Sequence, residues 1–492
     1  MKTIQSAFSK TTRPIRVLQY GEGNFLRGFV DYMIDIANEK GLFDGSIVLV
    51  KPISHGTLTT FKEQDCLYTV SLRGQENGKE TVQNRVVTSV ADVVDTYEQY
   101  EAYAAYAKLD TLRFIVSNTT EAGIVYSETD ELSMCPPASY PAKLTKFLYE
   151  RAEHFSYAAD KGLVILPVEL IDDNGIHLKE CVMKLATRWE LGEKFLAWLK
   201  SACVFASTLV DRIVTGYPKD EAEKLWAEWG YEDRLIVTGE PFALWVIESE
   251  SDISKELPLP QAGLPVVFTD NQKPYKQRKV RILNGAHTSF VLASYLCGHD
   301  TVLASMKDPL ILQFIRKTLE TEVIPTLTLP KDDLDAFAAA VLERFSNPFV
   351  HHLLLSISLN SVSKWRARCM PSLLDYAQKN SKVPACLAFS LAALMAFDSG
   401  DHIEDGALIA QRDGQPYRVQ DDANVMAFFL ENYALSADEL SRKFLGNVDF
   451  WGQDLTQVPG LLKVVSIALG DIRTLGMRGA MEKCLHEDAA HA

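Results

Sequence analysis

Residues 279–287 combine side chains that can move a proton and hold an oxyanion. Lys279 carries an ammonium group, Asn284 an amide and His287 an imidazole. On a helix these positions, together with Leu283, fall within one half of the circumference, so the three polar groups point into one region. The alternative interpretation is that Lys279 and Asn284 lie on a solvated helix face and that His287 is a core residue with its hydrogen bonds made within the protein.

This set of groups fits the interconversion of a carbonyl and an alcohol. Hydride transfer to a ketone leaves negative charge on oxygen and requires a proton. A lysine whose pKa is lowered by burial can supply the proton or accept it in the reverse direction. An asparagine amide can hold the developing oxyanion, and a histidine can bind a neighbouring hydroxyl or relay the proton.

A glycine turn near the start of the chain fits the phosphates of a dinucleotide. Gly21-Glu-Gly23 follows the apolar run 15–19 and precedes a helical pattern. Glycines there let backbone amides approach a pyrophosphate, which the amino terminus of the helix attracts. The third glycine, Gly28, comes later than the dinucleotide fingerprint places it, so a purely structural turn stays an alternative.

Two basic residues near this turn do not decide which dinucleotide cofactor binds. Arg27 lies one helical turn further on, either as a surface residue or beside the cofactor phosphates. The second expected strand ends at Lys51, where an acidic residue would have bonded the adenosine ribose and indicated NAD. Lys51 could even favour a 2′-phosphate, so the local sequence does not decide between NAD and NADP.

The secondary structure that we expect around these segments changes along the chain. The first part alternates buried strands with helices, which predicts a mostly parallel, doubly wound sheet that binds ligands at the carboxyl ends of its strands. We expect strands over 15–19, 47–50, 113–118 and 162–168, and a helix over 26–37.

Proline-rich stretches at 256–265 mark a boundary, beyond which the patterns are mainly helical. The expected helices cover 282–296, 310–319, 335–344 and 383–396. We therefore predict an N-terminal Rossmann-type α/β domain over 1–270 that binds a dinucleotide. A C-terminal all-helical domain over 271–492 would hold the substrate and the catalytic groups, with residues 279–287 near the cleft between the two domains.

Composition excludes several classes of protein. The net charge of −15 argues against nucleic-acid binding, although a small anionic ligand can still bind a locally basic site. The eight cysteines are scattered without a Cys-x-x-Cys pair, so we expect reduced thiols and no metal site. Because the sequence shows neither a membrane-spanning run nor a secretory signal, we expect a cytoplasmic protein with no membrane partner.

Several motifs resemble those of the long-chain mannitol dehydrogenase family. They are Gly21-x-Gly23-x-Phe25-x-Arg27, Val210-Asp-Arg-Ile213, Glu240-Pro-Phe242, Lys279-x-Arg-x-Leu-Asn284-x-x-His287 and Arg344-Phe-Ser-Asn347-Pro348. The resemblance covers nearly the whole chain and is specific in order and spacing. It implies a zinc-independent enzyme that binds NAD(H) and pairs a Rossmann-type domain with a helical substrate domain.

The resemblance also implies residue roles. Lys279 would be the general acid/base, Asn174 and Asn284 would polarise the carbonyl oxygen, and His287 would bind and orient the substrate. Asn174 follows the expected strand 162–168. The residues implied to bind the cofactor are Gly21, Gly23, Asn24, Phe25 and Arg27.

Within that family, three phrases resemble the branch that reduces tagaturonate. They are residues 19–28, 117–123 and 169–175. The Cys-Asp-Asn stretch of mannitol and fructuronate enzymes reads Val168-Glu-Leu170 here, and Phe29 replaces the histidine expected after the glycine turn. The resemblance thus implies NADH-dependent reduction of D-tagaturonate to D-altronate, with a small-molecule sugar acid as the substrate.

A sugar-acid substrate needs its carboxylate held, which lysine or arginine does best. Lys364 lies where the family places a substrate-facing basic residue, and Arg368 follows one turn later. For Arg368 a solvated helix end is the alternative. Other activities left open are fructuronate or mannitol-type oxidoreduction, oxidative decarboxylation and a non-catalytic nicotinamide sensor. The intact lysine, asparagine and histidine set argues against the sensor.

Overall fold

The computed structural model describes residues 1–76, 78–119 and 122–489, with side chains as far as residue 486. Thr120 and Glu121, which belong to the 117–123 phrase, lie outside these residues. The chain divides into two compact units, Met1–Gln272 and Lys273–Ala492.

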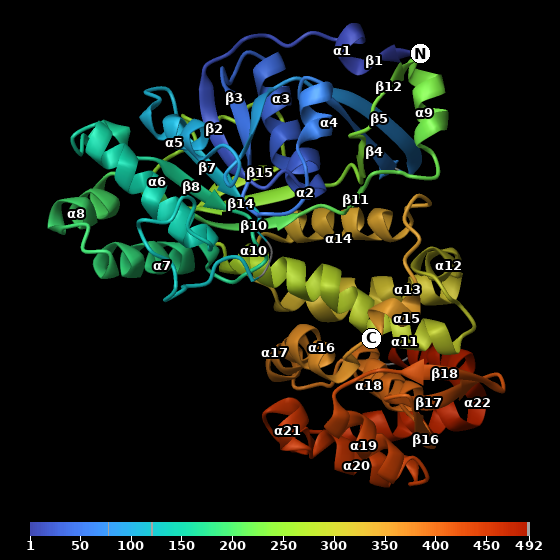
Figure 1. Cartoon of the computed structure of the whole chain (residues 1–492). Helices are drawn as coiled ribbons and strands as arrows, with labels where there is room; N and C mark the ends of the chain where they lie inside the picture. Colours follow the sequence, from blue (N-terminus) through green and yellow to red (C-terminus); the bar gives the residue numbers. More distant parts are fainter. Residues whose placement is uncertain (77, 120–121, 490–492) are drawn as a thin grey trace. The chain divides into compact units, whose positions relative to one another are not determined.

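A six-stranded parallel sheet forms the centre of the first unit (Figure 1). Its strands are β2 (Ile15–Tyr20), β3 (Ser46–Lys51), β6 (Val90–Asp95), β7 (Phe114–Ser117), β8 (Val164–Pro167) and β9 (Val204–Phe205). They lie in the order β6-β3-β2-β7-β8-β9, which is the order of a Rossmann sheet. The predicted doubly wound sheet is confirmed, and the glycine turn follows β2, where the strand order reverses.

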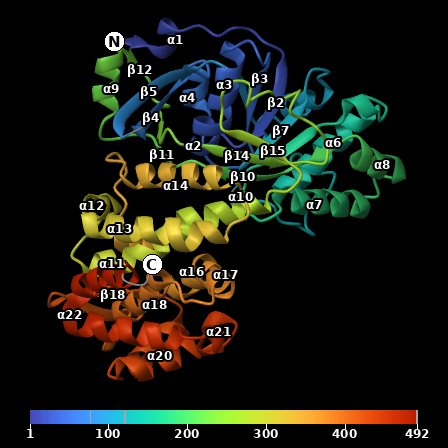
Figure 2. The same cartoon turned by 180° about the vertical axis from the view of Figure 1, so that it is seen from behind.

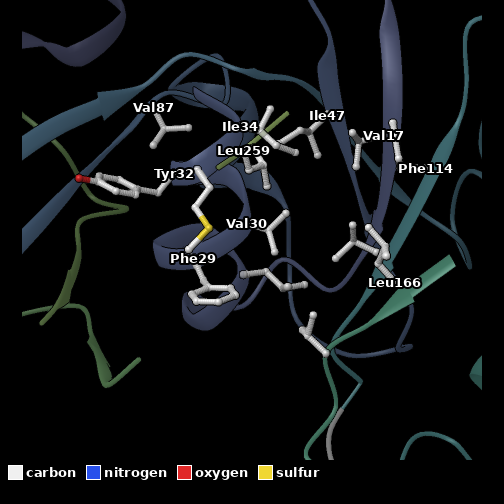
Figure 3. Close-up of a cluster of buried hydrophobic side chains, with 14 of the residues drawn as sticks. Val17, Phe29, Val30, Tyr32, Ile34, Ile47, Val87, Phe114, Leu166 and Leu259 are labelled. Atoms are coloured by element: carbon white, nitrogen blue, oxygen red, sulfur yellow. The ribbon is translucent and has the colours of Figure 1, made fainter. Parts of the chain in front are cut away.

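Each strand of this sheet supplies side chains to two cores, because successive residues point to opposite faces. On β2, Val17 packs with the helix that follows the glycine turn, whereas Leu18 packs with α6 (Tyr140–His154) and α7 (Asn174–Arg188). Each fully buried aliphatic side chain contributes about 1.5–3 kcal/mol. Figure 3 shows the first core, with labels on Val17, Phe29, Val30, Ile34, Ile47, Phe114 and Leu166.

The helices and short strands around this sheet complete the first unit. The helix after the glycine turn is continuous through α2 (Asn24–Leu26), η1 (Arg27–Asp31) and α3 (Tyr32–Glu39). The remaining helices are α1 (Ile4–Ala7), α4 (Thr59–Glu63), α5 (Tyr100–Ala105), η2 (Tyr106–Lys108), η3 (Ala159–Lys161), α8 (Glu193–Ser201) and α9 (Ala222–Trp229). Strands β1 (Lys2–Thr3) and β12 (Tyr231–Glu232) form a short parallel pair.

Two smaller sheets in the first unit are additions to the predicted fold. One has the order β11-β13-β4-β5 and the other the order β10-β14-β15. Their strands are β4 (Tyr68–Glu76), β5 (Lys79–Val87), β10 (Ser207–Asp211), β11 (Val214–Gly216), β13 (Val237–Gly239), β14 (Leu244–Glu248) and β15 (Val266–Thr269). Through Tyr68, Val237 and Trp245 these strands extend the first core beyond the Rossmann sheet.

The second unit is mainly helical, as predicted (Figures 1 and 2). It opens with one continuous helix formed by α10 (Lys273–Arg278), η4 (Lys279–Asn284) and α11 (Gly285–Leu296). The others are α12 (Val302–Lys307), α13 (Pro309–Lys317), η5 (Thr318–Val323), η6 (Ile324–Thr326), α14 (Lys331–Phe345), α15 (Leu354–Ile357), α16 (Ser361–Arg368), α17 (Met370–Asn380), α18 (Ala385–Phe397), α19 (Ala423–Asn432), α20 (Ala437–Leu445), α21 (Val448–Trp451), η7 (Leu455–Gln457) and α22 (Leu461–Ala489).

Helix α18 is the buried centre of this unit. Its residues are apolar on all sides, which is typical of a helix enclosed by others. The Glu322 carboxylate accepts hydrogen bonds of 2.8 Å from the backbone amides of both Cys386 and Leu387. This carboxylate satisfies amides at the helix amino terminus that would otherwise be buried without partners.

One part of the second unit is not helical, which corrects the expectation of an all-helical domain. Residues 402–419 form an antiparallel meander of β16 (His402–Glu404), β17 (Ala407–Arg412) and β18 (Gln415–Val419). Its two turns are Asp405-Gly406 and Asp413-Gly414, and all four residues have positive φ. Two-residue Asp-Gly turns favour hairpins, so the sequence held a signal for this meander.

None of the described helices is both long enough and apolar enough to cross a membrane.

Candidate active site

The glycine turn has the geometry of a phosphate-binding loop. Gly21 has φ of +118°, a conformation that favours glycine, and its amide donates to the Val50 carbonyl at 2.9 Å. A Cβ atom at Gly23 would meet no atom of the described residues within 4 Å, so among these residues the turn is open on that side. Since the helix begins at Asn24, its free amides face this opening, and the turn fits a pyrophosphate.

Gly28 serves packing instead. A Cβ atom there would lie 3.1 Å from Val237 of β13, so a larger residue would require this neighbour to shift. The Gly28 carbonyl also accepts a 2.7 Å hydrogen bond from Arg212, whose guanidinium donates to the carbonyls of Pro241 and Phe242 as well. The two family motifs around residues 212 and 242 thus support the helix behind the glycine turn.

Arg27 is buried and bonded within the protein. Its guanidinium donates to the carbonyls of Glu22 and Leu235 and to Oδ1 of Asn24, at 2.6–3.1 Å. It also lies 5.1 Å from the centre of the Tyr68 ring. These contacts hold the turn in shape, whereas the sequence had suggested either a surface residue or one beside the phosphates.

The neighbours of Arg27 on this helix differ in exposure. Asn24 is exposed, while Phe25 is half-buried and stacks on Phe29 with ring centres 5.1 Å apart. Asp31 is fully buried and accepts a 2.7 Å hydrogen bond from the Tyr68 hydroxyl. Burial raises the pKa of Asp31 to about 7, although the Tyr68 hydrogen bond and Arg27 oppose the shift.

Lys51, at the carboxyl end of β3, is buried and fully bonded. Its ammonium pairs with Asp95 at 2.8 Å and donates to the carbonyls of Ile53 and His55 at 2.8 and 3.2 Å. These three acceptors match the three N–H bonds of an ammonium group. The lysine therefore holds the segment after β3 in place.

Asn174 begins α7 at the carboxyl end of β8 and has no exposed surface. Its Nδ2 lies 3.0–3.1 Å from the carbonyl oxygens of Pro167, Glu169 and Thr208, which share its two N–H bonds, and its Oδ1 accepts from the Thr208 amide at 2.8 Å. The amide predicted to polarise a substrate carbonyl is thus engaged by the backbone.

Lys279 and Asn284 lie in a π-helical turn, and His287 follows in the α-helix after it. The predicted helix is confirmed, but the π turn in its middle is an addition. Such turns are rare and are frequently found at functional sites. A second π turn, η1, contains Arg27, so both predicted site helices depart from α geometry where the predicted site residues lie.

The side chains on this helix differ from Asn174 in their hydrogen bonding. Among the described residues the Asn284 side-chain amide, which is half-exposed, has no hydrogen-bond partner. Nε2 of His287 is buried and likewise has no partner within the described chain. Both groups are therefore available to a ligand.

An aromatic and basic cluster surrounds His287. Its ring stacks on Phe345 at 4.0 Å, and the His352 ring lies 5.3 Å away. Burial lowers the pKa of His287 well below its ordinary value, and the charges of Arg344 and Arg368 act in the same direction. His287 is therefore a neutral imidazole near neutral pH.

The basic residues of α16 reach the same helix. Arg368 donates to Oγ1 of Thr288 at 3.3 Å, and its backbone carbonyl lies 3.2 Å from where a Cβ of Gly285 would be. Lys364 donates to the Ile357 carbonyl at 3.0 Å, and burial lowers its pKa. The structure thus joins α16 to the helix of Lys279, although some 80 residues separate them in sequence.

Sequence reasoning missed His352, whose ring lies 5.3 Å from that of His287. His351 is exposed and His352 is half-buried, and both lie outside the helices. The contact of His352 with His287 had no signal in the sequence. In the described part of the chain, no group of three or more His, Cys, Asp or Glu residues could hold a metal ion.

The sheet order and the glycine turn define a dinucleotide-binding fold of the Rossmann type. The Mannitol dehydrogenase Rossmann domain matches residues 15–261, and the Mannitol dehydrogenase C-terminal domain matches residues 271–473. The chain belongs to the mannitol dehydrogenase family, and the family predicted from the motifs is confirmed.

The chain is similar over nearly its whole length to proteins named altronate oxidoreductase. It is 48% identical to the one from Pectobacterium atrosepticum over 486 residues, covering 96% of this chain and 98% of that protein. It is 44% identical to the one from Klebsiella pneumoniae strain 342 over 490 residues, covering 98% and 99%.

Two solved structures share the fold. A D-sorbitol dehydrogenase in substrate-free form has a TM-score of 0.79 at 22% identity, covering 98% of this chain and 100% of that one. Mannitol 2-dehydrogenase of Pseudomonas fluorescens, in a ternary complex with NAD and D-mannitol, has a TM-score of 0.63 at 21% identity, covering 98% and 96%.

Proposed function

We propose that this protein interconverts D-tagaturonate and D-altronate by hydride transfer with NAD(H). Residues 1–270 bind the dinucleotide, and residues 271–492 bind the sugar acid and supply the acid/base. One observation carries the proposal: Lys279 shares a helix with two polar groups, on Asn284 and His287, that have no partner among the described residues. The relatives named altronate oxidoreductase supply the substrate.

The glycine turn is the proposed cofactor site. The backbone at Gly21, Gly23, Asn24 and Phe25 fits the pyrophosphate, and Arg27 acts by holding the turn. When bound, the reduced nicotinamide supplies the hydride. NAD is also the cofactor in the ternary complex of the structural neighbour mannitol 2-dehydrogenase.

Lys279 supplies the proton. As the carbonyl carbon accepts a hydride, its oxygen gains negative charge, and the Lys279 ammonium transfers a proton to that oxygen, which gives the alcohol. In the reverse direction the neutral amine accepts the hydroxyl proton. The Asn284 amide donates to the same oxygen and stabilises the charge that develops on it.

The proposal gives His287 and Asn174 different roles in the reaction. Because His287 is neutral, its ring can exchange a hydrogen bond with a substrate hydroxyl through the unpartnered Nε2. Asn174 was expected to polarise the same carbonyl as Asn284. With its amide bonded to three carbonyl oxygens, it would act on the substrate only by exchanging one of them.

Lys364 and Arg368 are the proposed partners of the substrate carboxylate. Both lie on α16, which contacts the Lys279 helix at Thr288. Both side chains are half-buried, and this burial lowers the pKa of each, so a bound anion would stabilise their charges. A metal-free reaction in the cytoplasm is part of the proposal, and the eight unpaired cysteines fit a reducing compartment.

Substrate tests decide the proposal. NADH and NADPH oxidation is measured with tagaturonate, fructuronate and fructose, with and without a chelator. We expect the highest kcat/KM with tagaturonate and NADH, unchanged by the chelator. Faster reduction of fructuronate or fructose would overturn the substrate, release of carbon dioxide would indicate oxidative decarboxylation, and loss of activity on chelation would contradict the metal-free mechanism.

A further inference from the structure

The carboxyl edge of the Rossmann sheet has three charged side chains in neighbouring positions. Lys51 ends β3 and Asp95 ends β6, and the two are directly opposite in the strand register. Glu22 lies between the glycines of the turn, next to β3, because Gly21 donates to the Val50 carbonyl. In a Rossmann fold this region binds the ribose of the adenosine, where an acidic side chain accepts hydrogen bonds from the ribose hydroxyls.

Two of these three side chains are already engaged. The Lys51 ammonium has three acceptors, of which one is Oδ2 of Asp95. The other oxygen of Asp95 accepts from the backbone amides of Tyr97 and Glu98, at 2.8 and 3.2 Å. Lys51 thus has no N–H left for a 2′-phosphate, and Asp95 has little capacity left for a ribose.

Glu22 is the third charged side chain, and it differs. It is half-buried, and beyond its own backbone amide its carboxylate has no hydrogen-bond partner among the residues that the structure describes. Burial raises the pKa of this carboxyl, while the nearby charges of Lys51 and Arg27 oppose that rise and Asp95 adds to it. A half-buried carboxylate without a donor is stabilised by a ligand that brings hydroxyl groups.

We infer that Glu22 binds the adenosine ribose hydroxyls of NAD(H) and selects against the 2′-phosphate of NADP(H). The inference rests on the proposed function, since it assumes that the glycine turn binds a dinucleotide. Rossmann folds commonly carry a ribose-binding acidic residue at the end of the second strand, which is β3 here. Because β3 ends in a lysine instead, Glu22 in the glycine turn takes that role. A carboxylate accepts hydrogen bonds from both ribose hydroxyls, whereas it repels a phosphate at the same place.

Equilibrium binding to the whole protein, followed by nicotinamide fluorescence, tests the inference without turnover. The ligands are NADH, NADPH and an NADH analogue that lacks the adenosine 2′-hydroxyl. The variants are Glu22→Gln and a control, Glu98→Gln, which removes an exposed charge near the same edge. Loss of one charge-assisted hydrogen bond corresponds to about 10- to 100-fold in affinity.

We expect the unaltered protein to bind NADH at least about tenfold more tightly than NADPH or the 2′-deoxy analogue. Glu22→Gln should weaken binding of NADH more than binding of the analogue, which keeps only the 3′-hydroxyl as a donor to Glu22, and it should tighten NADPH binding. Glu98→Gln should leave all three affinities close to their original values. Because the first expectation concerns the unaltered protein, it holds even if the variant fails to fold.

Three results would overturn the inference. The unaltered protein could bind NADPH as tightly as NADH, Glu22→Gln could weaken NADH and the analogue equally, or Glu98→Gln could shift the preference as much as Glu22→Gln. If NADH binds in these experiments, the proposed function survives each of these results. If neither dinucleotide binds, the proposed function fails as well.

Discussion

The two predicted site helices use their polar groups in opposite ways. In the helix over 24–39, Arg27 and Oδ1 of Asn24 bond to each other, and Arg27 bonds to nearby carbonyls, which leaves backbone amides to face a ligand. In the helix over 273–296, the side chains of Asn284 and His287 lack partners in the described chain. In the proposed function, the first helix therefore binds its ligand through backbone amides and the second through side chains.

The difference between the two helices follows from the chemistry of the ligand that each is proposed to bind. A pyrophosphate is bound well by an array of amides whose positions depend on backbone shape, so the surrounding side chains serve to fix that shape. A carbonyl that is being reduced needs a transferable proton, which an acidic side chain such as a lysine ammonium provides well. Substitutions should therefore separate the two regions by what they change.

The largest expected effect is at Lys279. Lys279→Ala should lower kcat about 10²- to 10⁴-fold, because the reaction loses its acid/base. NADH affinity should stay unchanged, since the glycine turn is in the other unit. Steady-state kinetics and NADH fluorescence measure both, and Lys276→Ala on the same helix is the control. Near-normal kcat in Lys279→Ala, or an equal loss in the control, would contradict the proposed role.

The next effect compares two asparagines. Asn284→Ala should lower kcat about 10²- to 10³-fold and leave stability nearly unchanged, because the described protein loses no hydrogen bond. Asn174→Ala should destabilise the first unit by about 1–3 kcal/mol, because it leaves buried backbone groups without partners.

Urea unfolding and stopped-flow turnover separate the two variants. If Asn174→Ala keeps full stability and loses turnover, its amide acts on the substrate rather than on the backbone.

A smaller contrast concerns two glycines. Gly23→Ala should weaken NADH binding about tenfold or more and leave stability unchanged, because its Cβ points into open space where the phosphates are expected. Gly28→Ala should cost about 1–3 kcal/mol in stability, because its Cβ meets Val237 at 3.1 Å. Thermal unfolding and NADH titration measure both; unchanged NADH affinity in Gly23→Ala would argue against a phosphate site.

The smallest effect is a pH dependence at Asp31. Its pKa is about 7 in the fold and about 3.9 in an unfolded chain, so the folded state binds the proton more tightly. Stability from this group is complete below about pH 4 and is lost as pH rises through about 7. Between pH 5 and 8 the protein should lose about 2 kcal/mol relative to Asp31→Asn. The free energy of unfolding of both proteins is measured with urea at each pH. An equal difference between the unaltered protein and Asp31→Asn at the two pH values would show that Asp31 ionises normally.

Much of the first unit could be predicted because the strands are apolar on both faces and the glycines mark the turn. The predicted strands at 15–19, 47–50, 113–118 and 162–168 all occur. The strand β6 was missed because Asp92 interrupts its apolar run, and β9 because it has only two residues. The π turn at 279–284 has no local signal, since it depends on packing in the whole unit.

For the site, the residue types were predictable and their bonding was not. Spacing brought Lys279, Asn284 and His287 together on one helix, and the structure has that helix. The Asn174 amide is hydrogen-bonded to the backbone of Thr208, which lies 34 positions away in the sequence. Contacts over such distances leave no periodic pattern in a sequence.

The hydrogen bonds of Arg27 and Arg212 have a consequence for synthesis on the ribosome. The six strands of the Rossmann sheet are complete once Phe205 has been made. Yet Arg27 donates to the carbonyl of residue 235, and Arg212 joins Gly28 to residues 241 and 242. A nascent chain that ends after β9 therefore has every strand of the sheet but cannot fix the turn at its beginning. The glycine turn is therefore synthesised early but reaches its final hydrogen-bonded shape only when nearly half of the chain has emerged.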